Sequence, residues 1–124
     1  LNTTASTIMS LEPVIATQLL HRAQSTAIKI NYPYGLSVAY GTEARLLFYR
    51  VQFDSVQLLV NKAYSLIETE NDVKSISQKA SLIHITANVF QQKQVYDSAL
   101  AKYQEAIALF TKANDKNRLF FSYY

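Results

Sequence analysis

The side chains best suited to acid–base or metal chemistry in this 124-residue chain are its two histidines, His21 and His84. A catalytic base needs a nucleophile and an orienting group, and a helical metal site needs a second ligand three or four residues away. Neither histidine has another histidine or an acidic residue at that spacing. The chain also has no cysteine and only two glycines, too few for thiolate ligands or a phosphate-binding loop. We therefore expect a non-enzymatic chain without a metal or cofactor.

The charge pattern disfavours nucleic acid as a partner. The 12 basic and 9 acidic residues give a net charge of +3, and no two basic residues are adjacent. A groove that follows phosphates needs several Lys or Arg side chains close together. No apolar run approaches the roughly 20 residues that a membrane-spanning helix requires. We expect neither nucleic-acid binding nor membrane insertion of this segment.

The chain repeats itself at an interval of 43 residues. Residues 53–56, Phe-Asp-Ser-Val, recur as Tyr-Asp-Ser-Ala at 96–99, and Ala63 and Leu66 recur as Ala106 and Leu109. A similar pattern stands 40 residues upstream of Val56, Val60 and Ala63, formed by Ala16, Leu20 and Ala23. An interval of this size is typical of solenoids of helical hairpins, in which each unit buries its apolar face only against its neighbours.

Breaker-free stretches predict six helices joined by short turns. The expected helices cover about 13–30, 36–50, 54–68, 73–93, 96–113 and a sixth from residue 118, with Asp72 as a helix N-cap. The first has the apolar stripe Ile15, Ala16, Leu19, Leu20, Ala23, Ala27 and Ile30. Turns are expected at residues 31–35 and 114–117. We expect one domain over residues 1–124, with repeat units at about 36–72 and 73–113 and partial units at both ends.

Four alanines recur where paired helices must approach closely, namely Ala44, Ala63, Ala87 and Ala106. With their neighbours they resemble the tetratricopeptide repeat, whose signature has a small residue and an aromatic in its first helix and alanine, aromatic, alanine in its second. Residues 87–90 and 99–106 match every element, and the earlier unit matches with aliphatic replacements. The interval is 40 to 43 residues rather than 34, Tyr40 or Ile83 replaces the tryptophan, and the terminal proline is missing. The resemblance implies an all-α fold, a right-handed solenoid of stacked antiparallel hairpins.

A second resemblance rests on the short segments Ile30-Asn31-Tyr32, Gly35 and Ala39-Tyr40. They are similar to long-period repeats in the sensory regions of bacterial two-component histidine kinases. It implies a protein- or peptide-recognition module of a signalling protein, with any kinase activity outside this segment. It favours the extracytoplasmic side of a membrane-anchored sensor over the cytoplasm. The alternatives are a static assembly scaffold or envelope accessory protein, and a fragment that regulates a phosphotransfer enzyme directly.

The candidate binding site follows from the tetratricopeptide resemblance, because in that family the first helices of successive hairpins line a concave face. The residues expected there are Thr42, Arg45, Phe48, Tyr49, Ser81, His84, Asn88, Gln91 and Gln92. Arg45 and His84 can receive a carboxylate, and the Asn and Gln side chains can clamp an extended backbone. The alternatives are a solvated polar face with no ligand, or a groove that packs another part of the same polypeptide.

The chain begins at Leu1 and stops at Tyr124 inside an aromatic run, which predicts a segment of a longer protein. Apolar residues in 2–11 predict the end of a preceding helix. At the other end, Leu119, Phe120, Phe121, Tyr123 and Tyr124 form an apolar patch. We expect homo-oligomers through the Leu119–Tyr124 end, because exposed apolar patches mark association surfaces.

Overall fold

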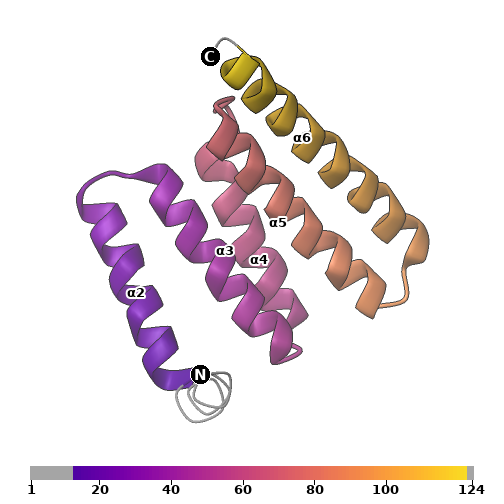
Figure 1. Cartoon of the computed structure of the whole chain (residues 1–124). Helices are drawn as coiled ribbons and strands as arrows, with labels where there is room; N and C mark the ends of the chain where they lie inside the picture. The colour runs from indigo at the N-terminus through magenta and orange to yellow at the C-terminus, as the bar shows by residue number, and fades with distance from the viewer. Residues whose placement is uncertain (1–12, 123–124) are drawn as a thin grey trace, which may run out of the picture.

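The computed structural model describes residues 13–122, which form five α-helices and no strand. The helices are α2 (Pro13–Lys29), α3 (Pro33–Tyr49), α4 (Phe53–Ile67), α5 (Val73–Gln92) and α6 (Tyr96–Ser122). Short turns join them, so that consecutive helices run in opposite directions (Figure 1). The prediction of an all-α fold is confirmed for the described residues. The expected helix at residues 2–11 lies outside them.

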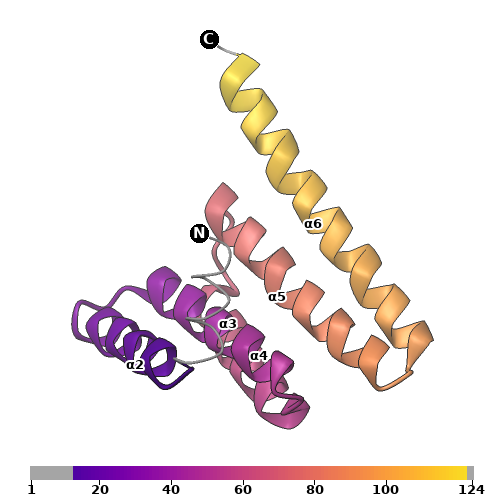
Figure 2. The ribbon, with the colours of Figure 1, turned by 60° about the horizontal axis from the view of Figure 1, so that its bottom comes forward.

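The helices pack in an open row. α3 packs along α4, α5 packs along α6, and α2 lies against α3. α5 also contacts both α3 and α4, and no further pair of the described helices is in contact. α2 and α6 therefore lie at opposite edges (Figures 1 and 2), and each has a flank that no other described helix covers.

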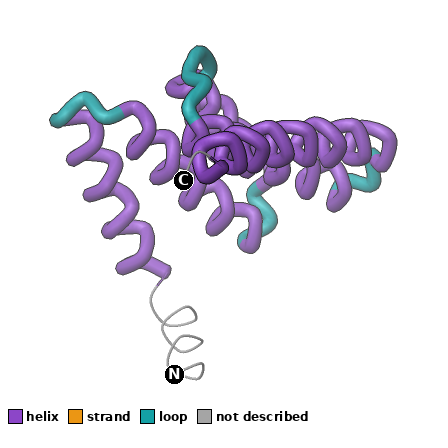
Figure 3. The backbone as a smooth tube through the Cα atoms, turned by 45° about the horizontal axis from the view of Figure 1, so that its top comes forward, coloured by secondary structure: helices purple, strands orange, loops and turns teal. Residues whose placement is uncertain are grey.

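The turns that end α3 and α5 have the same backbone geometry. Val51 and Gln94 have positive φ angles of 61° and 63° and stand 43 residues apart. The N–H of the next residue donates to a carbonyl five residues back in each case, Gln52 to Leu47 at 3.1 Å and Val95 to Phe90 at 2.9 Å. This is the Schellman motif, which satisfies carbonyls left unpaired at a helix end. The turns lie at the ends of the helices, as Figure 3 shows.

The four recurring alanines lie where the repeat pattern predicts. Ala44, Ala63 and Ala87 are fully buried and Ala106 is 2% exposed. Small side chains let two helix backbones approach, and the larger neighbours then fill the space beside them. A core of Ala44, Val56, Val60, Ala63, Ile67, Leu82, Ile85 and Val89 joins α3, α4 and α5. The prediction that these alanines serve packing is confirmed.

The first contact between the units is made by small and polar side chains. The amide of Gln78 on α5 donates to the carbonyl of Ser37 on α3 at 3.3 Å, and within the first unit the hydroxyl of Ser37 donates to the carbonyl of Ala63 on α4 at 2.8 Å. Gly41 lies beside them, where a Cβ would be 3.1 Å from the amide nitrogen of Gln78 and 3.3 Å from a methyl of Leu82. A Cβ at this position would press on Gln78 and Leu82, so the glycine favours the close approach of α3 and α5.

The second contact is a buried lysine at the turn between α4 and α5. Lys79 is only 6% exposed, and its ammonium donates to the carbonyl of Glu68 at 2.8 Å and to that of Glu70 at 2.5 Å. Both carbonyls lie at the C-terminal end of α4, where the helix dipole favours a positive charge. Lys79 thus fixes the start of the second unit to the end of the first.

Two helical predictions are wrong. The turn expected at 114–117 does not exist, because α6 runs without a break from Tyr96 to Ser122. Asn and Asp disfavour a helix by well under about 1 kcal/mol each, and neither Gly nor Pro stands there to stop it. The Leu119–Tyr124 side chains, through which association is expected, lie outside the described part.

The apolar stripe predicted for the first helix is also mostly wrong. Ile15, Leu19 and Ile30 are 47%, 57% and 64% exposed. Ala23 is exposed too, although its counterpart Ala63 is fully buried. α2 contacts only α3 among the described helices, so that Ala27 is buried and Leu20 half-buried, whereas the other stripe side chains that the structure describes are exposed.

Candidate functional site

Six of the nine predicted binding residues lie around one hollow of about 380 Å³ between α3 and α5. We call it the α3–α5 hollow; its predicted members are Arg45, Phe48, Tyr49, Ser81, His84 and Asn88. Two further side chains complete the lining, Ile85 of α5 and Phe110 of α6. Phe110 was missed because the sequence pattern assigned α6 to packing alone, although a phenylalanine four residues after Ala106 could have indicated it.

The other three predicted residues do not line the hollow. The hydroxyl of Thr42 donates to the carbonyl of Val38 at 2.9 Å, within its own helix. Gln91 accepts a hydrogen bond from the Tyr103 hydroxyl at 2.6 Å. Gln92 is exposed near the end of α5. Helical periodicity placed these residues on the correct helices but not in the hollow itself.

The floor of the α3–α5 hollow is held by a polar network between α5 and α6. The hydroxyl of Tyr103 lies 2.5 Å from the amide oxygen of Asn88 and 2.6 Å from that of Gln91. The amide nitrogen of Asn88 lies 3.4 Å from Nδ1 of His84, whose ring meets the Tyr103 ring edge-on at 5.4 Å between centroids. A hydroxyl has a single proton to donate, so the two amides share it. Asn88 and Gln91 are therefore partly engaged within the protein.

The α3 wall of the hollow is cationic and aromatic. Arg45 and Tyr49 are exposed, Tyr49 by 78%, whereas Phe48 is half-buried. The Phe48 ring lies 6.0 Å from that of Tyr49 and 5.5 Å from that of Phe53, which fixes its position. No acidic residue lines the hollow. Such a wall can pair with a carboxylate through Arg45 and cover an apolar side chain with its rings.

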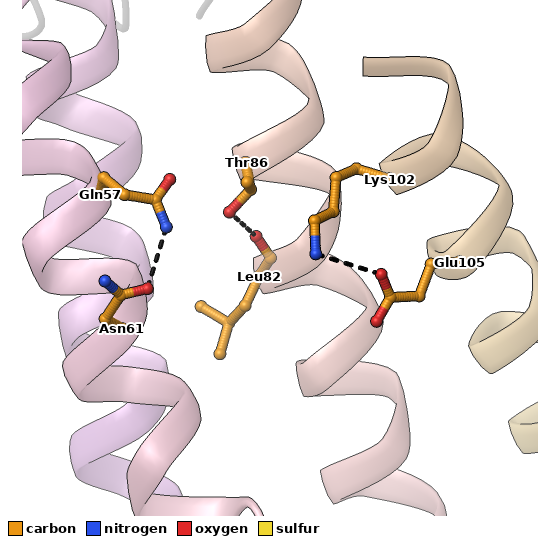
Figure 4. A network of polar contacts seen from close by, with 6 residues as sticks. All are labelled: Gln57, Asn61, Leu82, Thr86, Lys102 and Glu105. Atoms are coloured by element: carbon orange, nitrogen blue, oxygen red, sulfur yellow. Dashed lines mark hydrogen bonds and ion pairs between the residues drawn. The ribbon is translucent and has the colours of Figure 1, made fainter. Parts of the chain in front are cut away.

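A second, larger hollow of about 650 Å³ lies between α4 and α6, with α5 as its floor. Figure 4 shows its walls, with Gln57 and Asn61 on one side and Lys102 and Glu105 on the other. These groups pair within their own helices, Gln57 with Asn61 at 2.9 Å and Lys102 with Glu105 at 3.2 Å. Sequence reasoning missed this hollow, because it depends on the spacing of two helices that are not neighbours in the chain.

The two histidines have separate surroundings. Nε2 of His21 lies 3.6 Å from a carboxylate oxygen of Glu43, which also accepts from the amide of Gln24. This contact fastens α2 to α3. His84 lies in the α3–α5 hollow. Among the side chains that the structure describes, no three His, Asp or Glu come together as a metal site would require.

Every helix in the described part of the chain is too short or too polar to cross a bilayer. Comparisons of the chain with protein-family models, with curated proteins and with solved structures find no match.

Proposed function

We propose that this chain is a non-enzymatic recognition module of tetratricopeptide-like helical hairpins, which binds a protein or peptide segment in the α3–α5 hollow. The observation that carries the proposal is the convergence of Arg45, Tyr49 and His84 on one hollow without an opposing acid. A cation among aromatic rings suits a segment that ends in, or contains, a carboxylate beside an apolar residue.

The polar floor gives this site its orientation. Because Tyr103 holds the amide oxygen of Asn88, the remaining amide hydrogens of Asn88 point to a limited set of positions. A floor held in this way loses little side-chain entropy when a ligand binds. Ser81, half-buried in the same lining, offers a further hydroxyl.

The wider setting of the proposal is a sensor of a bacterial two-component system. It rests on the resemblance of residues 30–40 to the repeats of such sensors and on the tetratricopeptide-like spacing of the buried alanines. In this setting, a bound segment would change the angle between the two hairpins and so pass on a signal. The extracytoplasmic side remains the proposed location.

The test is a binding measurement on the purified chain. Peptides selected from a library for binding would be titrated by calorimetry against the wild-type chain and against Arg45→Ala and Tyr49→Ala. Both side chains are exposed, so neither substitution should change thermal stability appreciably. We expect each to weaken binding about tenfold, since a charge-assisted contact or an aromatic face is worth roughly 1–3 kcal/mol.

The matched control is Arg50→Ala, an exposed arginine five residues further along the chain and outside the lining of the hollow. It removes the same charge and should leave affinity unchanged. If Arg45→Ala and Arg50→Ala weaken binding equally, the attraction is one of net charge, and the hollow is not the site.

A static assembly scaffold is the second candidate function. The observation that favours it is the apolar flank of α6, where Leu100 and Ile107 are 58% and 63% exposed. Exposed apolar patches mark protein–protein contacts. A scaffold of this kind would bind partners constitutively, and its affinity would not depend on Arg45.

A further inference from the structure

The uncovered flank of α6 has an ordered row of large side chains. Tyr96, Leu100, Tyr103, Ile107 and Phe110 follow one another at alternating intervals of four and three residues. We call this row the α6 stripe. Four members are strongly exposed, by 63% at Tyr96, 58% at Leu100, 63% at Ile107 and 41% at Phe110. Alternating spacing of this kind is the pattern of a helix that packs along its length against another helix.

The residues of α4 that correspond to the α6 stripe in the internal repeat are covered by another helix. The residues 43 positions earlier on α4 are Phe53, Gln57, Val60, Tyr64 and Ile67, and none of them is exposed. There, α5 covers the pair formed by α3 and α4. Ile67 is 1% exposed, whereas its counterpart Phe110 is 41% exposed. The α6 stripe is thus an exposed surface for helix packing, which we call the seat. The equivalent surface of α4 is covered by α5.

The composition of the stripe is more apolar than that of its covered counterpart. Leu100 stands where α4 has the half-buried Gln57, so an exposed position has gained an apolar side chain. His84, by contrast, stands where α3 has Gly41, which lies against Gln78 and Leu82 of α5. The His84 side chain would therefore hold a helix that packs on the α6 stripe away from α5. Such a helix would make its main contacts with α6.

We infer that a second copy of this chain occupies the seat, with the two α6 stripes packed against each other in antiparallel orientation. The stripe is self-complementary, because reversing it about the midpoint between Tyr103 and Gln104 leaves large side chains at similar intervals and places Leu100 opposite Ile107 of the second copy. The outer flank consists of Asp97, Gln104 and Thr111, with a single charge. Antiparallel pairing sets this aspartate near Thr111 of the second copy, so like charges do not meet.

The area available suits a reversible dimer. The four exposed side chains would remove about 900 Å² from water over both copies, given roughly 200 Å² for each large side chain. The neighbouring His84, Gln91 and Gln104 bring the total to about 1,200 Å², the lower end of specific interfaces. Phe110 belongs both to this stripe and to the α3–α5 hollow, and His84, which borders the stripe, also lines the hollow.

The test is analytical ultracentrifugation of the whole chain over a range of concentrations. We expect the wild type to dimerise, and Ile107→Glu and Leu100→Lys each to raise the dimer dissociation constant about tenfold or more, because each would bury an unpaired charge. Leu58→Glu is the matched control, since Leu58 is 61% exposed on α4 away from the stripe. It should leave dimerisation unchanged. Circular dichroism would verify that every variant is folded.

Mixing the two variants tests the orientation. In an antiparallel pair, Glu at position 107 of one copy faces Lys at position 100 of the other, so an equimolar mixture of Ile107→Glu and Leu100→Lys should dimerise again. A wild type that stays monomeric at the highest soluble concentration overturns the inference. So does a dimer that survives both substitutions, or a mixture that stays monomeric. None of these results depends on peptide binding in the hollow.

Discussion

Val51 and Gln94 have the same left-handed backbone at the same place in two successive units, with φ of 61° and 63°. A glycine usually occupies this position at a helix end, because a side chain there crowds the backbone. Neither unit has one. The crowding is greatest at Val51, whose branched Cβ is the least suited to positive φ.

Replacement of Val51 by glycine should therefore stabilise the protein. The side chain is 68% exposed, so little packing is lost, and the left-handed strain of about 1 kcal/mol disappears. Urea denaturation of Val51→Gly should show a higher free energy of unfolding, by less than that amount because glycine also adds entropy to the unfolded chain. Arg50→Gly is the control: its φ is −90°, where glycine relieves nothing and lowers stability through the unfolded chain. Equal effects of the two substitutions would refute the argument.

Lys79 should be the most sensitive lysine in the chain. Lys79→Met keeps the buried stem but leaves the carbonyls of Glu68 and Glu70 without the ammonium. The free energy of unfolding should fall by roughly 1.5–3 kcal/mol, the range for hydrogen bonds to a charged group. Lys112→Met, at an exposed position of α6, should change it by less than about 0.5 kcal/mol. Thermal denaturation of the two variants side by side checks the difference.

The Tyr103 hydroxyl should contribute to the docking of α6 on α5. Tyr103→Phe removes the hydrogen bonds to Asn88 and Gln91 and nothing else, so stability should fall by about 0.5–1.5 kcal/mol. Tyr96→Phe serves as the comparison, because Tyr96 is 63% exposed. Its loss should be near zero. A change in the His84 ring signals by NMR in Tyr103→Phe alone would show that the network is continuous in solution.

The N-cap of α5 should make stability depend on pH. Hydrogen bonds from Ser75, first from its hydroxyl and then from its backbone N–H, lower the pKa of the Asp72 carboxyl below its ordinary 3.8. Because folding lowers this pKa, the stabilisation is complete above 3.8 and is lost as the pH falls through the folded value. Acid titration followed by circular dichroism measures it.

Two substitutions at position 72 separate charge from capping. Asp72→Asn keeps a capping oxygen and should flatten the acid dependence, whereas Asp72→Ala should also lower stability at neutral pH by about 1 kcal/mol. An unchanged acid limb in Asp72→Asn would show that other carboxyls control this transition.

The parts of the fold that depend on local spacing could be predicted from the sequence. The 43-residue interval of the repeat predicted the burial of Ala63 and Ala106. The capping residue Asp72 predicted the start of α5. The break expected at Asn114 failed because turn-forming side chains only weaken a helix, and nothing there stops it. Ala23 failed for another reason: its burial depends on a neighbouring helix, not on its own spacing.

In the candidate site, too, local spacing was predictable from the sequence, whereas contacts between helices were not. The tetratricopeptide resemblance, together with helical periodicity, led to Arg45 and His84 as binding candidates, and both line one hollow. It could not show that Asn88 is already bonded to Tyr103, because that contact joins two helices through the ends of their side chains. Phe110 was missed because its position was assigned to packing alone, although its spacing from Ala106 could have indicated it.

The near absence of side chain at Gly41 has a mechanical consequence for the two hairpins. The contact at Gly41 is tight, because a Cβ there would lie 3.1 Å from the Gln78 amide and 3.3 Å from Leu82, and the neighbouring Lys79 is bonded to the carbonyl of Glu68 at the end of α4. Arg45 lies about one helical turn beyond Gly41 on α3 and lines the same hollow as His84. Any change in the angle between α3 and α5 would therefore alter the separation of Arg45 and His84, and with it the width of the α3–α5 hollow.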